Sequence, residues 1–517
     1  MWRHVVENEA SVRQNIGCYT PMQLPPGGLV VIITPEQAAL KSQERFDHLL
    51  DLVRQASHDG ERIDTVERDL MRHLLALGHD LLALFIANQG DGDLGPTVEA
   101  PEGRTLHRLP RSHVRRYVSL FGEFTIPRVV HGTREGQKIE CVPLDRRLGL
   151  PEGDFSYVLE DWGQRFCLKE SFAEAGRSLE MLLGLNLGRR TLEQMNRTVA
   201  GYAPAFRAAI EPPSSEEEGP LLVVTADGKG VPMRKPVPDG PQPHHRPTRG
   251  EKRNKKQMAC VGAVYSIKPF VRTADDILDE VMRKKRAKDR PRPRHKHAWA
   301  EMIREVEGEP PVTAKDGLFC QLHDELVIRN LGQDRPVICL MDGERSLWDA
   351  QGAFSPEAVG VLDLFHVLER VWGVAHCVHK QGSDEAEAYV EERLRELLEG
   401  RVGSVIEEFR QCITRQHLRG NKRQVVKSAI EYLENNREHL KYDEYLAAGY
   451  PIGSGVAEGA CRHLVKDRLE QTGMRWTVTG AQAMLHVRAL YLNDQWEEYM
   501  EFRVEQEQAR LYQRNAA

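Results

Sequence analysis

The sequence of 517 residues has little cysteine, no long apolar run and no overall excess of positive charge. Its nine cysteines are scattered without any Cys-x-x-Cys pair, which argues against a disulfide framework or a cysteine zinc cluster. No uninterrupted apolar run reaches the ~18–20 residues that span a bilayer, and charged residues interrupt the short apolar stretches after Met1. We therefore expect a cytoplasmic protein with neither a signal peptide nor a membrane segment.

The net charge of −6 argues against a uniformly basic surface, but positive charge is concentrated in two segments. Residues 281–297 hold nine Lys or Arg and one acid, and residues 246–256 hold six Lys or Arg and one acid. Both segments are rich in breakers or long flexible side chains, which predicts loops. They are either solvated surface loops or cationic contacts for the phosphates of DNA.

Hydrophobic residues make up 40% of the chain and charged residues 29%, a balance typical of globular proteins. At about 100–200 residues per domain, the length predicts more than one domain. The pattern predicts a helical region, a β-hairpin with a helix-turn-helix-like pair, an α/β region interrupted by helices, and a helical tail. The helical region covers 1–110, and the hairpin with its helix pair covers 111–211. The α/β region covers 220–366 and 449–495, the helices that interrupt it cover 367–448, and the tail covers 496–517.

The helical N-terminal region contains a breaker-free segment at 62–89 with leucines on one helical stripe. These leucines are Leu70, Leu74, Leu77, Leu81 and Leu84. The stripe fits either an amphipathic helix packed on its own domain or a short dimerisation seam. Glycine and proline in residues 90–110 predict a linker.

The next region contains two candidate DNA-binding features. Residues 113–131 are rich in β-branched and aromatic residues around Gly122, which predicts a hairpin. Ser171 is a plausible N-cap for a helix to about Leu183, and a break precedes a second helix from about Arg190. This pattern fits a helix-turn-helix motif, but such helix pairs also occur in any α domain.

Beyond residues 212–219 the chain alternates strands and helices, and three acids follow at their ends. Asp227 follows the apolar strand 221–226, Asp342 follows the strand 337–341, and Glu458 lies at a helix start among glycines. Further strands are expected at 258–267 and 358–365, and helices at 322–331, across 367–448 and from 456 to about 510, with a break at 473–480. The carboxyl ends of strands in α/β sheets are where sites form.

Converging carboxylates suit one kind of chemistry in particular. Phosphodiester cleavage and strand transfer use two hard cations, about 4 Å apart, to hold the attacking and leaving oxygens. Mg²⁺ prefers oxygen ligands and retains water, so a few carboxylates suffice. Each Asp-Gly pair taken alone is also a common turn, so the pattern leaves both interpretations open.

Four blocks of the sequence carry a resemblance to a known family. They are TADGKGVPM (225–233), MDGERSLWD (341–349), LDLFHVLERVW (362–372) and YPIGSGVAEGACRHLVKDRLEQTGMRW (450–476). In this combination and order, the chain resembles bacterial insertion-sequence transposases of the ISKra type, which are DDE enzymes related to Mutator-like transposases. The resemblance extends over most of 113–495.

The resemblance implies an α/β catalytic core, a ribonuclease-H-like mixed sheet with flanking helices, interrupted by an all-helical insertion at 367–448. It implies Asp227, Asp342 and Glu458 as catalytic metal ligands for Mg²⁺, with Mn²⁺ as a substitute. Asp363, in Asp-Leu-Phe-His, is an alternative second acid, and His366 is either an auxiliary residue or a structural histidine.

The implied partners are double-stranded DNA, as terminal inverted repeats and target, and further copies of the chain in a homodimer or larger assembly. A location in the bacterial cytoplasm, at the nucleoid when bound to DNA, follows. The candidate DNA contacts are Lys229, Arg253, Lys255, Lys256, Arg283, Lys284, Lys285, Arg286, Arg462, Lys466 and Arg475. Arg462 and Lys466 follow Glu458 on the same helical face, where they also fit an ordinary surface ion pair.

Two other functions fit the same residues. One is a non-catalytic DNA-binding protein derived from a transposase, and the other is a structure-specific nuclease of the same fold. Inverted repeats flanking the gene would favour a mobile element over the first. A strand-transfer assay with Mg²⁺ would separate a transposase from the second.

Overall fold

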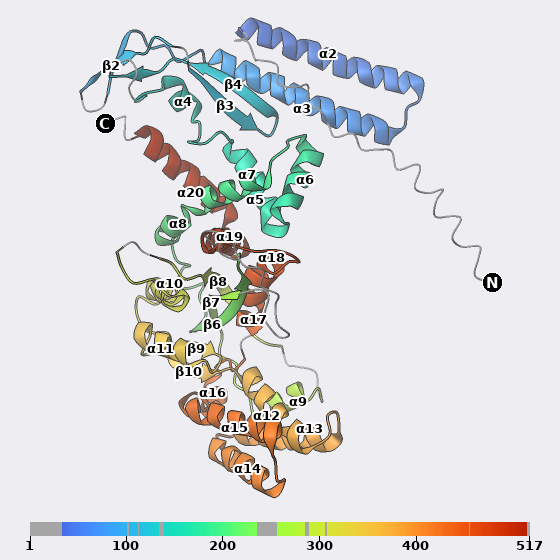
Figure 1. Cartoon of the computed structure of the whole chain (residues 1–517), viewed down its shortest axis with the longest axis vertical. Helices are drawn as coiled ribbons and strands as arrows, with labels where there is room; N and C mark the ends of the chain where they lie inside the picture. Colours follow the sequence, from blue (N-terminus) through green and yellow to red (C-terminus); the bar gives the residue numbers. More distant parts are fainter. Residues whose placement is uncertain are drawn as a thin grey trace, which may run out of the picture. The chain divides into compact units, whose positions relative to one another are not determined.

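The computed structural model describes residues 34–100, 103–111, 113–133, 139–234, 256–284, 289–305, 308–453 and 455–513. The chain divides into two compact units (Figure 1). Unit 1 contains Met1–Val199 and Glu498–Ala517, and unit 2 contains Ala200–Glu497. Both helices and sheets are present, which confirms the mixed α/β class that the sequence predicts.

Unit 1 begins with a helical hairpin of α2 (Pro35–Asp59) and α3 (Ile63–Asn88), which lie side by side in Figure 1. Thr34 starts α2 with a capping box, and Gly60 ends it in the left-handed conformation at φ 64°. Inside the hairpin, the buried Asp80 pairs with Lys41 and Arg45 of α2. The predicted helix at 62–89 is thus confirmed.

α3 is long and apolar enough, by length and composition alone, to cross a membrane, and no other helix in the described ranges is. The expectation of no such segment rested on uninterrupted apolar runs, whereas Arg72 and Asp80 interrupt this helix. Length and composition do not separate a membrane span from an amphipathic helix of a globular unit. The ion pairs of Asp80 fit the second description.

A β region follows the helical hairpin in unit 1. β3 (His113–Ser119) and β4 (Gly122–Arg128) form the predicted hairpin, whose tight turn requires Gly122 at φ 125°. β1 (Thr97–Glu99), β2 (Thr105–Arg108) and β5 (His131–Gly132) form a second small sheet. The prediction of a plain linker at 90–110 was therefore wrong in part, because breakers also flank short strands.

Helices complete unit 1. They are α4 (Pro143–Leu148), α5 (Tyr157–Lys169), α6 (Phe172–Leu183), α7 (Arg189–Ala200), α20 (Trp496–Gln508) and the π-helical turn Ala509–Gln513. Ser171 caps α6 with a capping box and Gly184 ends it at φ 69°, as the sequence indicated. Arg503 of α20 is buried and donates to Glu160 of α5 over 2.6 Å. The C-terminal helix is thereby fastened to unit 1.

Unit 2 is built on one five-stranded sheet in the order β10-β9-β6-β7-β8. The strands are β6 (Leu221–Pro232), β7 (Lys256–Ile267), β8 (Arg294–Glu301), β9 (Val337–Met341) and β10 (Val359–Leu362). β6, β9 and β10 run parallel, whereas β7 and β8 are antiparallel additions on the other side of β6.

Two details differ from expectation. β6 does not end at Asp227 but continues to Pro232, because β7 has the same length and pairs with it throughout. The basic segment 281–297 is not simply a loop, since α9 (Ala274–Val281) ends at its start and β8 begins at Arg294. The apolar residues of β8, Ala298–Ala300, form only a short run after its charged first half, which hid the strand from the pattern. Residues 246–255 of the other basic segment lie outside the described residues.

Helices surround this sheet in unit 2. α8 (Ala203–Ala209) packs on α19 (Val478–Leu492), which packs on β8, and α10 (Ala314–Arg329) packs on β7. α11 (Arg345–Phe354) connects β9 to β10. The remaining segments near the sheet are α17 (Gly455–Ala460), a π-helical segment (Cys461–Lys466) and α18 (Asp467–Leu469).

The predicted helical stretch at 367–448 is present. It contains α12 (Leu364–Val378), α13 (Asp384–Leu398), α14 (Val402–Arg415), α15 (Gly420–Asn435), a 3₁₀ turn (Arg437–His439) and α16 (Tyr442–Ala448). Its buried residues Val371, Leu394 and Phe409 belong to the same apolar cluster as Val223 and Leu340 of the sheet. The helices therefore share one core with the sheet.

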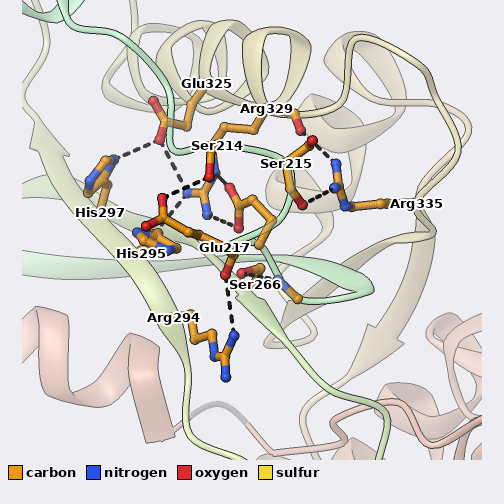
Figure 2. Close-up of polar contacts among 12 residues, drawn as sticks. Ser214, Ser215, Glu217, Ser266, Arg294, His295, His297, Glu325, Arg329 and Arg335 are labelled. Carbon is orange, nitrogen blue, oxygen red and sulfur yellow. Dashed lines mark hydrogen bonds and ion pairs between the residues drawn. The ribbon is translucent and has the colours of Figure 1, made fainter.

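A buried charged cluster fixes the segment that leads into β6 (Figure 2). Arg329 of α10 donates to both oxygens of Glu218, over 2.6 and 3.0 Å, and to Glu325 over 3.2 Å. Glu325 also contacts His297 of β8 at 2.7 Å. Arg335 adds a bond to the carbonyl of Ser215. These contacts hold the predicted boundary segment 212–219 in place just before β6, the strand that carries Asp227.

Candidate functional site

Asp227 and Asp342 are neighbours on adjacent parallel strands, with Asp227 inside β6 and Asp342 directly after the end of β9. β6 and β9 are in register through Ala226 and Met341, and each acid is the next residue. Parallel strands lie roughly 4.8 Å apart, so the two carboxylates face one small region. Both side chains are half-buried.

Electrostatics supports this closeness. Burial raises the pKa of Asp342 above its ordinary value, and the negative charge of Asp227 raises it further. The backbone amide of Glu344 donates to Asp342 over 2.9 Å and opposes that rise. A positive charge placed between the two acids would favour their ionised forms.

Asp227 has two close donors. Its Oδ1 accepts from the amide of Gly228 over 2.6 Å, and its Oδ2 lies 3.3 Å from the thiol sulfur of Cys461. Burial, followed by the charge of Asp227, raises the pKa of Cys461, so this thiol stays protonated and donates. No pattern in the sequence singles out Cys461, because a lone cysteine in a helix looks like any other.

Asp363 occupies the equivalent position on the next strand. β10 is in register with β9 through Leu362 and Met341, and the amide of Asp363 donates to the carbonyl of Met341 over 2.8 Å. Its side chain is fully buried and caps α12 by accepting from Phe365 over 2.8 Å. Capping and burial give Asp363 a structural role, and Asp342 is the more accessible of the two acids.

Glu458 lies on α17, which packs against β6 and β7, and its side chain is exposed. One helical turn later comes Cys461, the thiol beside Asp227. Nevertheless, no three His, Cys, Asp or Glu side chains in the described part of the chain gather closely enough to hold one ion. The structure therefore brings Asp227 and Asp342 together without adding Glu458 to the pair.

His366 lies in the first turn of α12, three residues after Asp363. It is half-buried, and it lies close enough to Asp342 that a positive charge on its ring lowers the pKa of that carboxyl. The predicted auxiliary histidine is therefore an electrostatic neighbour of Asp342.

The candidate DNA contacts differ in their surroundings. Lys256 and Lys284 form ion pairs, with Glu470 at 2.5 Å and with Glu391 at 2.6 Å. Arg462 lies 3.7 Å from Asp467, while Lys229 is half-buried on β6. The exposed members are Arg283, at φ 55°, Lys466 and Arg475. Arg253, Lys255, Lys285 and Arg286 lie outside the described residues.

The helical segment contributes one residue that sequence reasoning missed. Tyr432 of α15 lies so close to Gly343 that a Cβ there would collide with its ring. Burial, and then the charge of Asp342, raises the pKa of Tyr432 to about 12. Tyr432 also lies beneath the guanidinium of Arg370, 4.9 Å from its ring centre. The sequence shows the glycine after Asp342, but it does not show that the ring of Tyr432 leaves room only for glycine there.

Comparison of the chain with protein-family models and with curated proteins finds no match.

Proposed function

We propose that this chain is a DDE-type DNA transposase that cleaves and joins DNA strands at the ends of an insertion sequence. The observation that carries the proposal is the placement of Asp227 and Asp342 side by side on adjacent parallel strands, where the charge of Asp227 raises the pKa of Asp342. Two carboxylates in this arrangement are disfavoured unless a cation joins them.

The sheet supports a ribonuclease-H-like fold for this unit. Three antiparallel strands begin with β6, and two further strands, β9 and β10, run parallel to β6 on its other side. Asp227 lies within the first of these strands, and Asp342 follows β9, the first parallel addition. This is the mixed sheet that the family resemblance implies for Asp227 and Asp342.

The residues present fit a hard divalent cation. Both donors are carboxylate oxygens, and Mg²⁺ retains several waters, so two such ligands are sufficient to begin a site. Bound divalent cations activate the attacking oxygen and stabilise the leaving 3′-oxygen in phosphodiester chemistry. In this proposal Asp227 and Asp342 bind the ion, and Glu458 is the third acid. His366 tunes Asp342.

Cations on the α17 side of the sheet suit the DNA backbone. Lys466 and Arg475 are exposed, and Arg462 has only a long ion pair with Asp467. Phosphate contacts of this kind hold a duplex in register without reading its sequence.

The test is an assay of cleavage and strand transfer on DNA carrying the terminal repeats of the element, with Mg²⁺. Asp227→Asn, Asp342→Asn and Glu458→Gln should each lower both activities at least 100-fold, while DNA binding changes little. Matched controls at exposed acids, Asp334→Asn and Glu431→Gln, should retain activity. Full activity in the three site variants would overturn the proposal.

The same assay separates the alternatives. Cleavage without joining would identify a nuclease. DNA binding without either reaction in the unmodified chain would identify a non-catalytic DNA-binding protein.

A further inference from the structure

The helical hairpin of unit 1 carries an apolar surface that its own packing leaves exposed. Only 6% of the most apolar 18-residue window of α3 is buried. On α3 the large exposed apolar side chains are Ile63, Met71, Leu74, Leu81 and Phe85, at intervals of three, four, seven or eight residues. These intervals place them on one helical stripe.

α2 contributes a second stripe with the same spacing. Phe46, Leu50 and Val53 are 47%, 40% and 38% exposed. The contacts of Lys41 and Arg45 with Asp80, and of His48 with His73, show that α2 and α3 run antiparallel. At 100° per residue, both stripes then fall on the same side of the hairpin. Together they form one face, which we call the hairpin face.

Phe121, in the turn between β3 and β4, borders the hairpin face. Its ring lies directly on Gly78, and it is itself 39% exposed. Gly78 falls between Leu74 and Leu81 on the α3 stripe. Any side chain at this position would collide with the ring, so the glycine allows Phe121 to pack against this edge of the hairpin face.

The C-terminal half of α3 carries almost no charge. Between His73 and Asn88, the single Asp, Glu, Lys or Arg is Asp80. Asp80 points into the hairpin and is neutralised by Lys41 and Arg45. The outer face is therefore apolar and uncharged over this half, as it is in helices that pack on other helices.

We infer that the hairpin face is the contact between two copies of this chain, joined as a four-helix bundle. A large side chain that is about half exposed presents roughly 90 Å², so the nine exposed side chains offer about 800 Å² per copy, the amount that each partner gives to a stable interface. In a symmetric dimer one patch meets its own copy, and apolar stripes with three- and four-residue spacing are self-complementary. The interface is independent of Asp227 and Asp342.

The test measures the mass of the full chain in solution by sedimentation over a range of concentrations. The unmodified chain should be a dimer. Leu74→Glu with Leu81→Glu places two charges on the hairpin face and should weaken the dimer at least about 100-fold. Leu331→Glu, at a 79% exposed leucine of unit 2, is the matched control and should leave the mass unchanged. Both leucines of α3 are about half exposed, so circular dichroism should show an unchanged fold.

A charge-exchange experiment identifies the occupant. The Glu variant and a Leu74→Lys, Leu81→Lys variant should each be monomeric, and mixing them should restore a dimer. A monomeric unmodified chain would overturn the inference, as would a dimer that the Glu variant retains. Binding of α3 to lipid vesicles with loss of the dimer would point instead to a membrane surface. If a monomeric chain dimerised only after removal of residues 1–33, that segment would be the occupant.

Discussion

The buried cluster around Arg329 predicts a large and specific loss of stability on mutation. The side chains of Arg329 and Glu218 are 0% and 1% exposed, and Glu325 is 9% exposed. Arg329→Met preserves most of the volume but leaves two carboxylates buried without their cation. Removing one partner of a buried ion pair costs about 3–5 kcal/mol, which lowers the Tm of a unit of this size by roughly 10 °C.

The matched control is Arg395→Met. Arg395 pairs with Asp275 at 2.7 Å on the surface, with exposed fractions of 38% and 73%. A surface pair of this kind contributes about 0–1 kcal/mol. Adding Glu218→Gln and Glu325→Gln to Arg329→Met should recover part of the loss, because the stranded charges are then gone. If Arg329→Met and Arg395→Met unfold at the same urea concentration, the reasoning is wrong.

The pH dependence has a defined sign. Burial opposes ionisation of Glu218, but the hydrogen bonds from Arg329 and Ser266 and the charge of Arg329 hold its pKa below the ordinary 4.5. A lowered folded-state pKa contributes stability that is present above the unfolded value and is lost as pH falls through the folded value. The difference in the free energy of unfolding between the unmodified chain and Arg329→Met should therefore be largest near neutral pH and shrink below about pH 4.5.

Other outcomes follow from the site. Burial raises the folded-state pKa of Asp342, so its contribution to stability falls as pH rises through that pKa. Asp342→Asn should therefore raise the metal-free Tm near pH 7, and an unchanged or lower Tm would contradict this. Gly343→Ala should cost about 1–3 kcal/mol through collision with Tyr432, in urea unfolding, and Gly343→Ala with Tyr432→Leu should restore most of it. In calorimetry without DNA, Asp227→Asn should weaken Mn²⁺ binding at least tenfold, while Glu458→Gln should leave Mn²⁺ binding unchanged. Equal losses in the two variants would show that Glu458 also binds the ion in the absence of DNA. With a thiol reagent, Cys320 should react in the native chain and Cys461 only after unfolding, as mass spectrometry of the labelled peptides would reveal.

Much of the sheet could be predicted because its strands are continuous apolar runs. Val337–Met341 matched its strand residue for residue, since a strand buried on both faces has no competing pattern. β8 was missed because four of its eight residues are basic, and its apolar half follows only after Arg294–His297. Pairing along β7, a long-range contact, extended β6 beyond Asp227.

Some residues of the candidate site could likewise be predicted from the sequence, and others could not. Asp227 and Asp342 were predictable because each directly follows an apolar run, and parallel pairing then makes them neighbours. Cys461 and Tyr432 were not, since each meets its partner across more than 80 residues of chain. Sequence patterns report local periodicity, whereas these contacts depend on how distant helices pack on the sheet.

The choice between Asp342 and Asp363 shows how packing resolves what pattern leaves open. Both acids follow parallel strands in register, so their local sequences are equivalent. β9 lies beside β6, however, whereas β10 lies one strand further out. Asp342 is therefore the acid adjacent to Asp227, and the charge of Asp227 raises its pKa. Asp363 is fully buried and already caps α12. A cation shared with Asp227 would thus meet Asp342 first, and strand order, rather than strand sequence, decides between them.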